Sequence, residues 1–294
     1  RTSTHAMAST EGAHEHALGP EHLAACAALS ASAHWNQNEA DWALMLEFGR
    51  GYGLTLDDGT LAASTLTLPY GQSFAWIAMV LVHPECRRRG YATRLLRHAL
   101  DDLARDGRMA VLDATPAGRE VYRQEGFRDT WSFRRLALAQ AWRGASESAL
   151  GIRVHALQPQ DWPGIAALDL PAFGANREFL LRSLATRLPQ AALVAERDGQ
   201  LTGFLLGREG REAHQLGPLV ARDTESARAL LAAGLAAVPP PLYLDLVDRE
   251  TELRTWLERG GFAFQRPFTR MVHGGAEAPG GASLVVCPAG PELG

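Results

Sequence analysis

The chain has 294 residues, a length typical of about two domains, and its 46% hydrophobic and 21% charged residues are typical of a globular protein. Its net charge of −4 argues against a general role in nucleic-acid binding, and its three widely spaced cysteines form neither a disulfide framework nor a zinc motif. The sequence contains no lysine, which excludes Schiff-base chemistry, and no apolar run long enough to span a bilayer.

The N-terminal stretch is polar. Residues 1–12 are interpreted as an expression remnant outside the fold. We expect His14 and His16 to lie in a mobile, solvated terminus rather than at a metal site. A first helix is predicted from Glu21 to Ala31, because Pro20 suits a helix start and a carboxylate suits the first turn.

A second helix and a hairpin follow. Asn38 is the predicted N-cap of this helix, and Asp41, three residues later, completes a capping box. The hairpin is predicted from the strands Tyr52–Leu56 and Leu61–Leu68, with an Asp-Asp-Gly turn between them. Pro69 is expected to end the second strand.

The next segment combines an apolar strand, a basic turn and a helix. From Phe74 to Val82 almost every side chain is apolar, which predicts a central strand buried on both faces. Pro84 ends this strand, and apolar residues then recur at helical spacing within Tyr91–Ala104. Three arginines, Arg87–Arg89, lie at the helix start, where free N–H groups and the helix dipole favour an anion. The turn is therefore a candidate phosphate site.

A second strand and helix complete the first half. Met109–Asp113 is predicted as a buried strand, parallel to the central one through a right-handed crossover. Thr115 and Pro116 suit the start of a helix that carries Tyr122 and ends at Gly126. A further strand, Trp131–Leu138, precedes a linker at residues 141–150.

The second half of the chain repeats this pattern. Gly126-Phe127 recurs as Gly261-Phe262. In the same register the chemistry is lost, because Gly90 is replaced by Glu225 and Tyr122 by Leu257. A carboxylate at that turn would repel an anion, so we expect the second half to have lost cofactor binding.

These motifs resemble a known family. Arg87-x-x-Gly90-x-Ala92, after a strand that ends Val82-x-Pro84, resembles the acetyl-CoA loop of the GNAT N-acetyltransferase superfamily. Tyr122, four residues before Gly126, matches the position where many members carry a general acid. Residues 172–177 and 217–221 resemble a bacterial subfamily of tandem GNAT proteins, and the whole resemblance covers residues 19–272.

The resemblance implies an α/β (α+β) fold of two tandem GNAT-type acyl-CoA acyltransferase domains, each a mixed, mostly antiparallel sheet flanked by helices. Residues 13–140 would form the catalytic domain and residues 151–294 a degenerate GNAT-like domain. The second domain would pack on the first, shape the acceptor pocket or mediate a homodimer.

The resemblance also implies acetyl-CoA as cosubstrate and no metal. A backbone N–H near Leu81 and Val82 would polarise the thioester carbonyl, and Tyr122 would protonate the departing thiolate. The residues expected at the cofactor are Val80, Leu81, Val82, Arg87, Arg88, Arg89, Gly90, Tyr91, Ala92 and Thr93.

The sequence leaves the general base open. Asp41 and His34 are the first candidates, with Glu39 and Asp113 as further ones. Cys86 has no identified basic partner, so a covalent acetyl-enzyme is not expected. The residues expected at the acceptor are Trp35, Asn36, Gln37 and Asp113. Capping and core packing are an alternative role for the segment that holds the first three.

These features predict an acyltransferase, an acetyl-CoA-dependent N-acetyltransferase that acts on a small-molecule amine by direct attack on the thioester. A protein or peptide N-acetyltransferase and a non-catalytic acyl-CoA-binding regulatory protein are the alternatives. The retained Tyr122 and arginine loop favour an enzyme. We expect a bacterial, cytoplasmic protein with no nucleic-acid or membrane partner.

Overall fold

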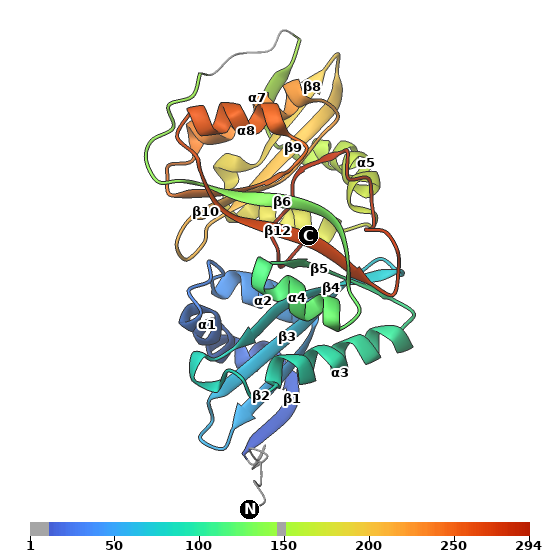
Figure 1. Cartoon of the computed structure of the whole chain (residues 1–294). Coiled ribbons are helices and arrows are strands. Elements are labelled where there is room, and N and C mark those ends of the chain that lie inside the picture. The colour runs from blue at the N-terminus through green and yellow to red at the C-terminus, as the bar shows by residue number, and fades with distance from the viewer. Residues whose placement is uncertain (1–11, 146–150) are drawn as a thin grey trace, which may run out of the picture. The chain divides into compact units, whose positions relative to one another are not determined.

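The computed structural model describes residues 12–145 and 151–294, so most of the predicted remnant and half of the predicted linker lie outside the described residues. The chain divides into two compact units (Figure 1). The first holds the described residues up to Pro69 together with Ile77–Gly107, and the second holds Tyr70–Trp76 and Arg108–Gly294. Strand β4 (Phe74–Val82) therefore begins in the second unit and ends in the first.

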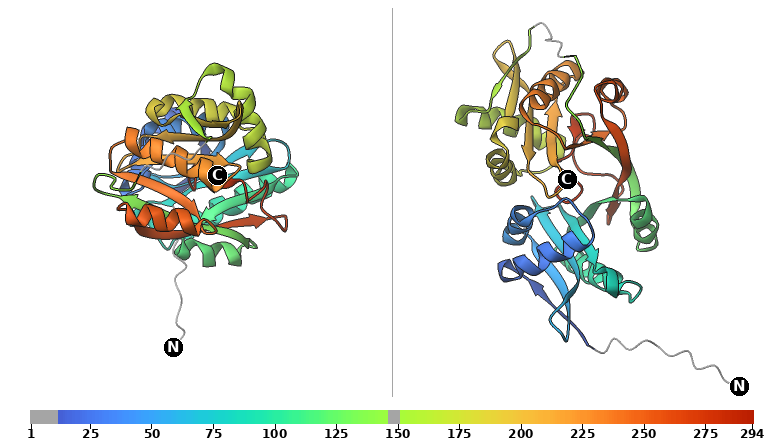
Figure 2. Two further views of the ribbon diagram at one scale, coloured as in Figure 1. Left: turned by 90° about the horizontal axis from the view of Figure 1, so that it is seen from above. Right: turned by 90° about the vertical axis from the view of Figure 1, so that its left-hand side faces the viewer.

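The first unit is a sheet with α1 and α2 on one face and α3 on the other (Figure 2). Its strands, in sheet order, are β1 (Ala13–Leu18), β2 (Arg50–Leu56), β3 (Leu61–Tyr70) and the Ile77–Val82 part of β4. Its helices are α1 (Leu23–Ser32), α2 (Glu39–Phe48) and α3 (Tyr91–Arg105), with short 3-10 turns η1 (Pro20–His22) and η2 (Pro84–Cys86). The predicted apolar face of α3 is confirmed, since Leu95, Leu96 and Ala99 are buried.

The expectation of a mobile terminus at His14 and His16 is wrong, although the His14 side chain is 73% exposed. Both residues belong to β1, which pairs antiparallel with β2. His14 hydrogen-bonds Asp57 at 2.8 Å and His16 hydrogen-bonds Thr55 at 2.6 Å, so partners on or beside β2 order this polar strand. Among the described residues, no group of His, Cys, Asp or Glu side chains is arranged to hold a metal ion.

Pro69 does not end β3 as expected. The strand continues to Tyr70, whereas its ladder with β2 stops at Arg50↔Thr67. Pro69 thus lies beyond the β2 ladder, where its missing N–H leaves no β2 partner unsatisfied. The capping box of α2 is confirmed, because Asn38 and Asp41 exchange two hydrogen bonds of 3.1 Å.

The second unit is a longer mixed sheet. Its strands, in sheet order, are the start of β4, β5 (Met109–Ala114), β12 (Ala263–His273), β6 (Arg128–Leu138), β11 (Leu242–Val247), β10 (His214–Ala221), β9 (Gln200–Arg208), β8 (Leu193–Arg197) and β7 (Arg153–Ala156). Its helices are α4 (Pro116–Gln124), α5 (Trp162–Phe173), α6 (Glu178–Arg187), α7 (Thr224–Ala237) and α8 (Thr251–Arg259), with 3-10 turns η3 (Pro159–Asp161) and η4 (Pro189–Ala191). In the described part of the chain, no helix has the length and apolar character needed to cross a membrane.

The two halves of the sequence exchange their last long strands. β12, from the second half, pairs with β5, and β6, from the first half, pairs with β11. β6 and β12 also pair with each other and run side by side in Figure 1. The predicted boundaries at residues 140 and 151 follow the repeat in the sequence, whereas the compact units follow these exchanged pairings.

Each exchanged strand brings one buried ion pair. Arg270 on β12 binds Asp113 on β5 through bonds of 2.8 and 2.9 Å. Arg135 on β6 binds Asp245 on β11 through bonds of 2.8 and 3.0 Å. In both cases the arginine lies directly opposite its aspartate in the antiparallel register. The second unit therefore repeats one bidentate arginine–carboxylate contact at both exchanges.

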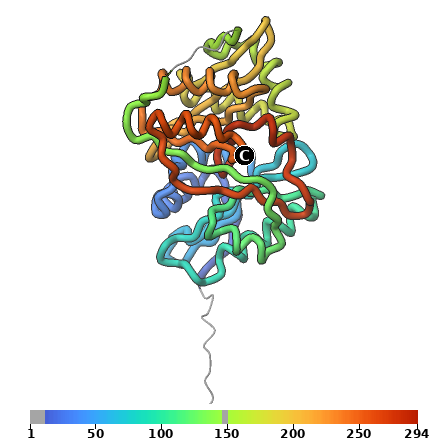
Figure 3. The backbone as a smooth tube through the Cα atoms, turned by 45° about the horizontal axis from the view of Figure 1, so that its top comes forward, coloured from blue at the N-terminus to red at the C-terminus, as the bar shows by residue number. Residues whose placement is uncertain are grey.

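The C-terminal segment packs into the second unit rather than forming an exposed tail. β13 (Val285–Cys287) pairs with β10, and Val286 and Cys287 join the apolar core. Arg177 donates to the Gly294 carbonyl at 2.9 Å, and Arg208 forms a buried ion pair with Glu292. The chain path from β12 into this buried segment is the red end of the tube in Figure 3.

Candidate functional site

The basic turn of the first unit is built as an anion site. Arg87, Arg88 and Arg89 are exposed and form no hydrogen bond or ion pair with any residue that the structure describes. The turn leads into α3, whose N-cap is Gly90 and whose first N–H groups receive no side-chain cap. Three guanidinium groups and an uncapped helix start therefore meet in one turn, which favours a phosphate ligand.

The backbone conformation at position 90 favours glycine. Its φ of 78° lies in the left-handed region, where a side chain is disfavoured, whereas a Cβ added there would have no atom within 4 Å. The remaining predicted cofactor residues lie along the chain on both sides of the turn. Tyr91, Ala92 and Thr93 form the first turn of α3, and Val80–Val82 end β4.

The end of β4 carries a local irregularity. Met79 has φ 53°, an unusual value for a non-glycine residue within a strand, and its carbonyl accepts a hydrogen bond of 2.8 Å from the Ser64 hydroxyl. The parallel ladder of β4 with β5 covers only Phe74–Trp76. The β4–β5 ladder thus stops before the stretch that was predicted to supply a backbone N–H to the thioester.

In the second half, the helix start and the strand that correspond to the arginine turn and to β4 interact with other residues of the chain. Asp223 caps α7 by accepting from the Ser226 N–H at 2.7 Å, and Arg197 pairs with Asp223 at 3.4 Å and with Glu225 at 2.9 Å. β13 covers part of the edge of β10, opposite Leu219 and Val220. A helix start with its own carboxylate cap and a strand edge with its own partner leave no comparable anion site.

Tyr122 lies on α4 in the second unit. Its side chain is partly buried against Phe127, with ring centroids 5.7 Å apart, and its hydroxyl bonds no other described residue. Burial raises the pKa of Tyr122 to about 12. The phenol therefore keeps its proton throughout the physiological range and can act as a hydrogen-bond donor.

The residues predicted for the acceptor and the base differ in their exposure and hydrogen bonding. Gln37 carries a buried Oε1 atom that accepts no hydrogen bond within the described chain. His34 is exposed with φ 60°, and Glu39 is exposed in the first turn of α2. Asp41 is buried. Its carboxylate already accepts a hydrogen bond from the Asn38 N–H in the capping box of α2. Trp35 and Asn36 are partly buried next to Gln37.

Asp113 is committed to Arg270. Burial raises the pKa of Asp113, and the Arg270 guanidinium offsets part of that rise. The same guanidinium lies 4.5 Å from the Trp76 ring centroid and 4.2 Å from that of Trp131. Sequence reasoning missed Arg270, although its signal was present: Arg135 and Arg270 occupy equivalent positions in the two halves.

Two family models match the chain. The Acetyltransferase (GNAT) family model matches residues 21–127, and the Acetyltransferase (GNAT) domain model matches residues 165–285. The chain belongs to the GNAT superfamily. It is an acyltransferase with two tandem GNAT domains, which confirms the predicted family and fold class.

Relatives agree with this assignment. The uncharacterized N-acetyltransferase YitH of Bacillus subtilis is 25% identical over 247 residues, 83% of this chain and 86% of its own length. The mycothiol acetyltransferase of Sanguibacter keddieii is 28% identical over 190 residues, 54% of this chain and 60% of its own length.

Solved structures show the same GNAT fold. A putative acetyltransferase from Pyrococcus horikoshii gives a TM-score of 0.79 at 18% identity, with 100% of both chains covered. A tandem GNAT protein from the clavulanic acid biosynthesis pathway gives a TM-score of 0.66 at 16% identity, with 92% of this chain and 99% of that chain covered.

Proposed function

We propose that this GNAT acyltransferase uses acetyl-CoA to acetylate a small-molecule amine by direct attack on the thioester. The observation that carries the proposal is the turn of Arg87–Arg89, in which three arginines that bind no described residue lie at an uncapped helix start. Such a turn fits a pyrophosphate, because N–H groups and guanidinium groups both favour bound anions. The relative named mycothiol acetyltransferase favours a small-molecule acceptor over a protein.

The proposal gives separate tasks to this chain's residues. Bound acetyl-CoA supplies the activated acetyl group. Arg87–Arg89 and the start of α3 hold its pyrophosphate, and a backbone N–H near Leu81 or Val82 stabilises the oxyanion that develops on the carbonyl. Gln37 lies next to Trp35 and Asn36 in the segment that we assign to the acceptor. The ammonium loses its proton to an exposed base such as His34 or to water, since the Asp41 carboxylate already caps α2.

Tyr122 completes the reaction by donating to the sulfur as the carbon–sulfur bond breaks. Its pKa of about 12 keeps it protonated, although it exceeds the value of about 8.5 for an ordinary thiol. The phenol is thus a weak acid that transfers its proton only as thiolate charge develops, and it regains a proton from water.

Tyr122→Phe tests this role. The variant should keep acetyl-CoA binding and lose about 10²–10⁴-fold in kcat, the usual contribution of one general acid. Release of free thiol from acetyl-CoA, measured across small amines and a peptide N-terminus, gives both turnover and acceptor class. The wild-type rate should show no alkaline loss from Tyr122 below its pKa of about 12. Full activity of the variant would remove Tyr122 from the mechanism, and acetyl-CoA binding without turnover on any amine would favour a regulatory protein.

A further inference from the structure

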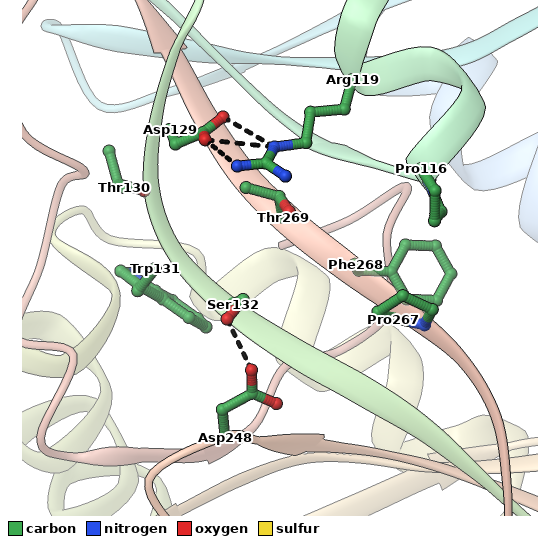
Figure 4. Close-up of a pocket in the computed structure, with 10 residues that line it drawn as sticks. All are labelled: Pro116, Arg119, Asp129, Thr130, Trp131, Ser132, Asp248, Pro267, Phe268 and Thr269. Atoms are coloured by element: carbon green, nitrogen blue, oxygen red, sulfur yellow. Dashed lines mark hydrogen bonds and ion pairs between the residues drawn. The ribbon is translucent and has the colours of Figure 1, made fainter.

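Helix α4, which carries Tyr122, packs against a strand from the second half of the sequence. The helix lies on β5 and on β12, and β12 is the strand that the second half contributes through the exchange. At the start of α4, Pro116 and Arg119 line a cavity of about 360 Å³ together with residues 267–269 of β12 (Figure 4). At the other end, the segment that follows α4 meets the last residue of β12, His273.

His273 packs against the two residues that precede β6. Its ring lies 5.1 Å from the Phe127 ring, measured between centroids. A Cβ added to Gly126 would come within 3.2 Å of the imidazole Nε2 and 3.3 Å of Cδ2, so the missing side chain of Gly126 leaves room for the imidazole. Glycine at this position therefore suits both the left-handed backbone, φ 96°, and the packing of His273.

Phe127 in turn contacts Tyr122. The Phe127 side chain is buried and its ring lies 5.7 Å from the Tyr122 ring, and the Phe127 N–H donates to the Tyr122 carbonyl at 3.0 Å. A Cβ added to Gly118 would come within 3.0 Å of Tyr122 Cε2, so the tyrosine ring lies close to the backbone of the preceding helical turn. The position of the Tyr122 ring thus depends on the α4 backbone and on Phe127, and that of Phe127 depends on His273.

Helix α4 itself is held independently of His273. Arg119 donates to Asp129 on β6 from Nε at 3.1 Å, and Arg123 donates to the same carboxylate from Nη2 at 2.6 Å. Loss of the imidazole would therefore leave the helix in place while the rings that pack on it shift. Such a shift matters for proton transfer by Tyr122, because a misplacement of about 1 Å can cost about 10²-fold in rate.

We propose that His273 is a positioning residue for Tyr122, supplied by the second half of the sequence through the strand exchange. It acts by packing, through the row of rings His273, Phe127 and Tyr122, and it does not transfer a proton itself. This inference rests on the proposed role of Tyr122 as general acid. It gives the second half of the sequence a part in the reaction of the first.

The kinetics of variants that remove or keep the ring test the proposal. His273→Ala should lower kcat about tenfold, because a shift of a fraction of 1 Å at the Tyr122 hydroxyl is enough, and it should leave the KM for acetyl-CoA unchanged. His273→Phe keeps an aromatic ring and should recover most of kcat with the pH–rate profile of the wild type. A His273→Phe enzyme as slow as His273→Ala would mean that the imidazole acts by its own chemistry, and would overturn the packing role.

A matched control comes from the same strand. Phe264→Ala removes a ring at the start of β12, where the side chain is 53% exposed, and should leave kcat unchanged. A crystal structure of His273→Ala should show the Phe127 and Tyr122 rings displaced from their wild-type positions. A tenfold loss in Phe264→Ala, or unmoved rings in His273→Ala, would overturn the inference.

A double-mutant cycle separates this inference from the proposed function. If His273 acts through the Tyr122 hydroxyl, His273→Ala should cost little further turnover in the Tyr122→Phe background. Full activity of Tyr122→Phe would remove the general acid, and the inference with it. If Tyr122→Phe loses turnover while His273→Ala stays fully active, or if His273→Ala costs the same in both backgrounds, the inference is overturned and the role of Tyr122 stands.

Discussion

Replacing Gly90 by glutamate would copy the second half of the chain into the first. The change has two consequences that can be separated. Any side chain at φ 78° is strained, at a cost of about 1–2 kcal/mol of folding free energy. Because a Cβ meets nothing within 4 Å, no steric cost is added. Gly90→Gln bears the same strain without the charge and is the matched control.

The charge itself acts on the bound anion. A carboxylate about 6 Å from one phosphate charge in water costs about 0.7 kcal/mol, and a pyrophosphate carries about two such charges. The glutamate also competes for the free N–H groups at the start of α3, as Asp223 does on α7. Together these effects predict that Gly90→Glu binds acetyl-CoA at least about tenfold more weakly than Gly90→Gln.

Thermal unfolding with and without acetyl-CoA measures this difference. In the wild type, ligand at about 100 times its Kd should stabilise the fold by about 2.7 kcal/mol. Gly90→Gln should keep most of that stabilisation, and Gly90→Glu should lose at least about half of it relative to Gly90→Gln at the same ligand concentration. Equal stabilisation in both variants would refute the assignment of the arginine turn as the pyrophosphate site.

Three further predictions concern the second half and the core. Titration with acetyl-CoA should give one site per chain, because Asp223 caps α7 and β13 covers part of the β10 edge; two sites would contradict this. Arg135→Met should cost about 3–5 kcal/mol in urea unfolding by leaving Asp245 buried and unpaired, and the Arg135→Met/Asp245→Leu double variant should recover most of it; a single-variant loss below about 1 kcal/mol would contradict the buried pair. A thiol reagent should modify none of the three cysteines of the native chain, since all are buried and burial raises the pKa of Cys26 to about 12; fast reaction before unfolding would be inconsistent with this packing.

The sequence predicted those parts of the molecule that depend on local pattern. The arginine turn, the helix after Gly90 and the capping box of α2 each follow from neighbouring residues, and each is present. The altered turn of the second half could also be predicted from the sequence, because a carboxylate at Asp223 or Glu225 is a local feature. The roles of Tyr122 and of the predicted acceptor and cofactor residues stay predictions.

Long-range pairing was beyond the sequence pattern. β6 and β12 have the same alternation whether they pair within their own half or across halves, so nothing local distinguishes the exchange. The C-terminal segment is rich in glycine, alanine and proline and has no periodicity, and distant arginines such as Arg177 and Arg208 hold it in place. The repeat places Arg135 and Arg270 at equivalent positions, but it does not show that Arg270 pairs with Asp113, which lies far away in the sequence.

The strand exchange also bears on why both halves of the chain persist. A mutation that removed the second half would take β12 from β5 and both β12 and β11 from β6, exposing three unpaired strand edges in the remaining part. Such edges favour swapping between copies or aggregation. Once the two halves had exchanged strands, neither half could be deleted without disrupting the sheet of the other. Each half is thereby retained by selection for folding.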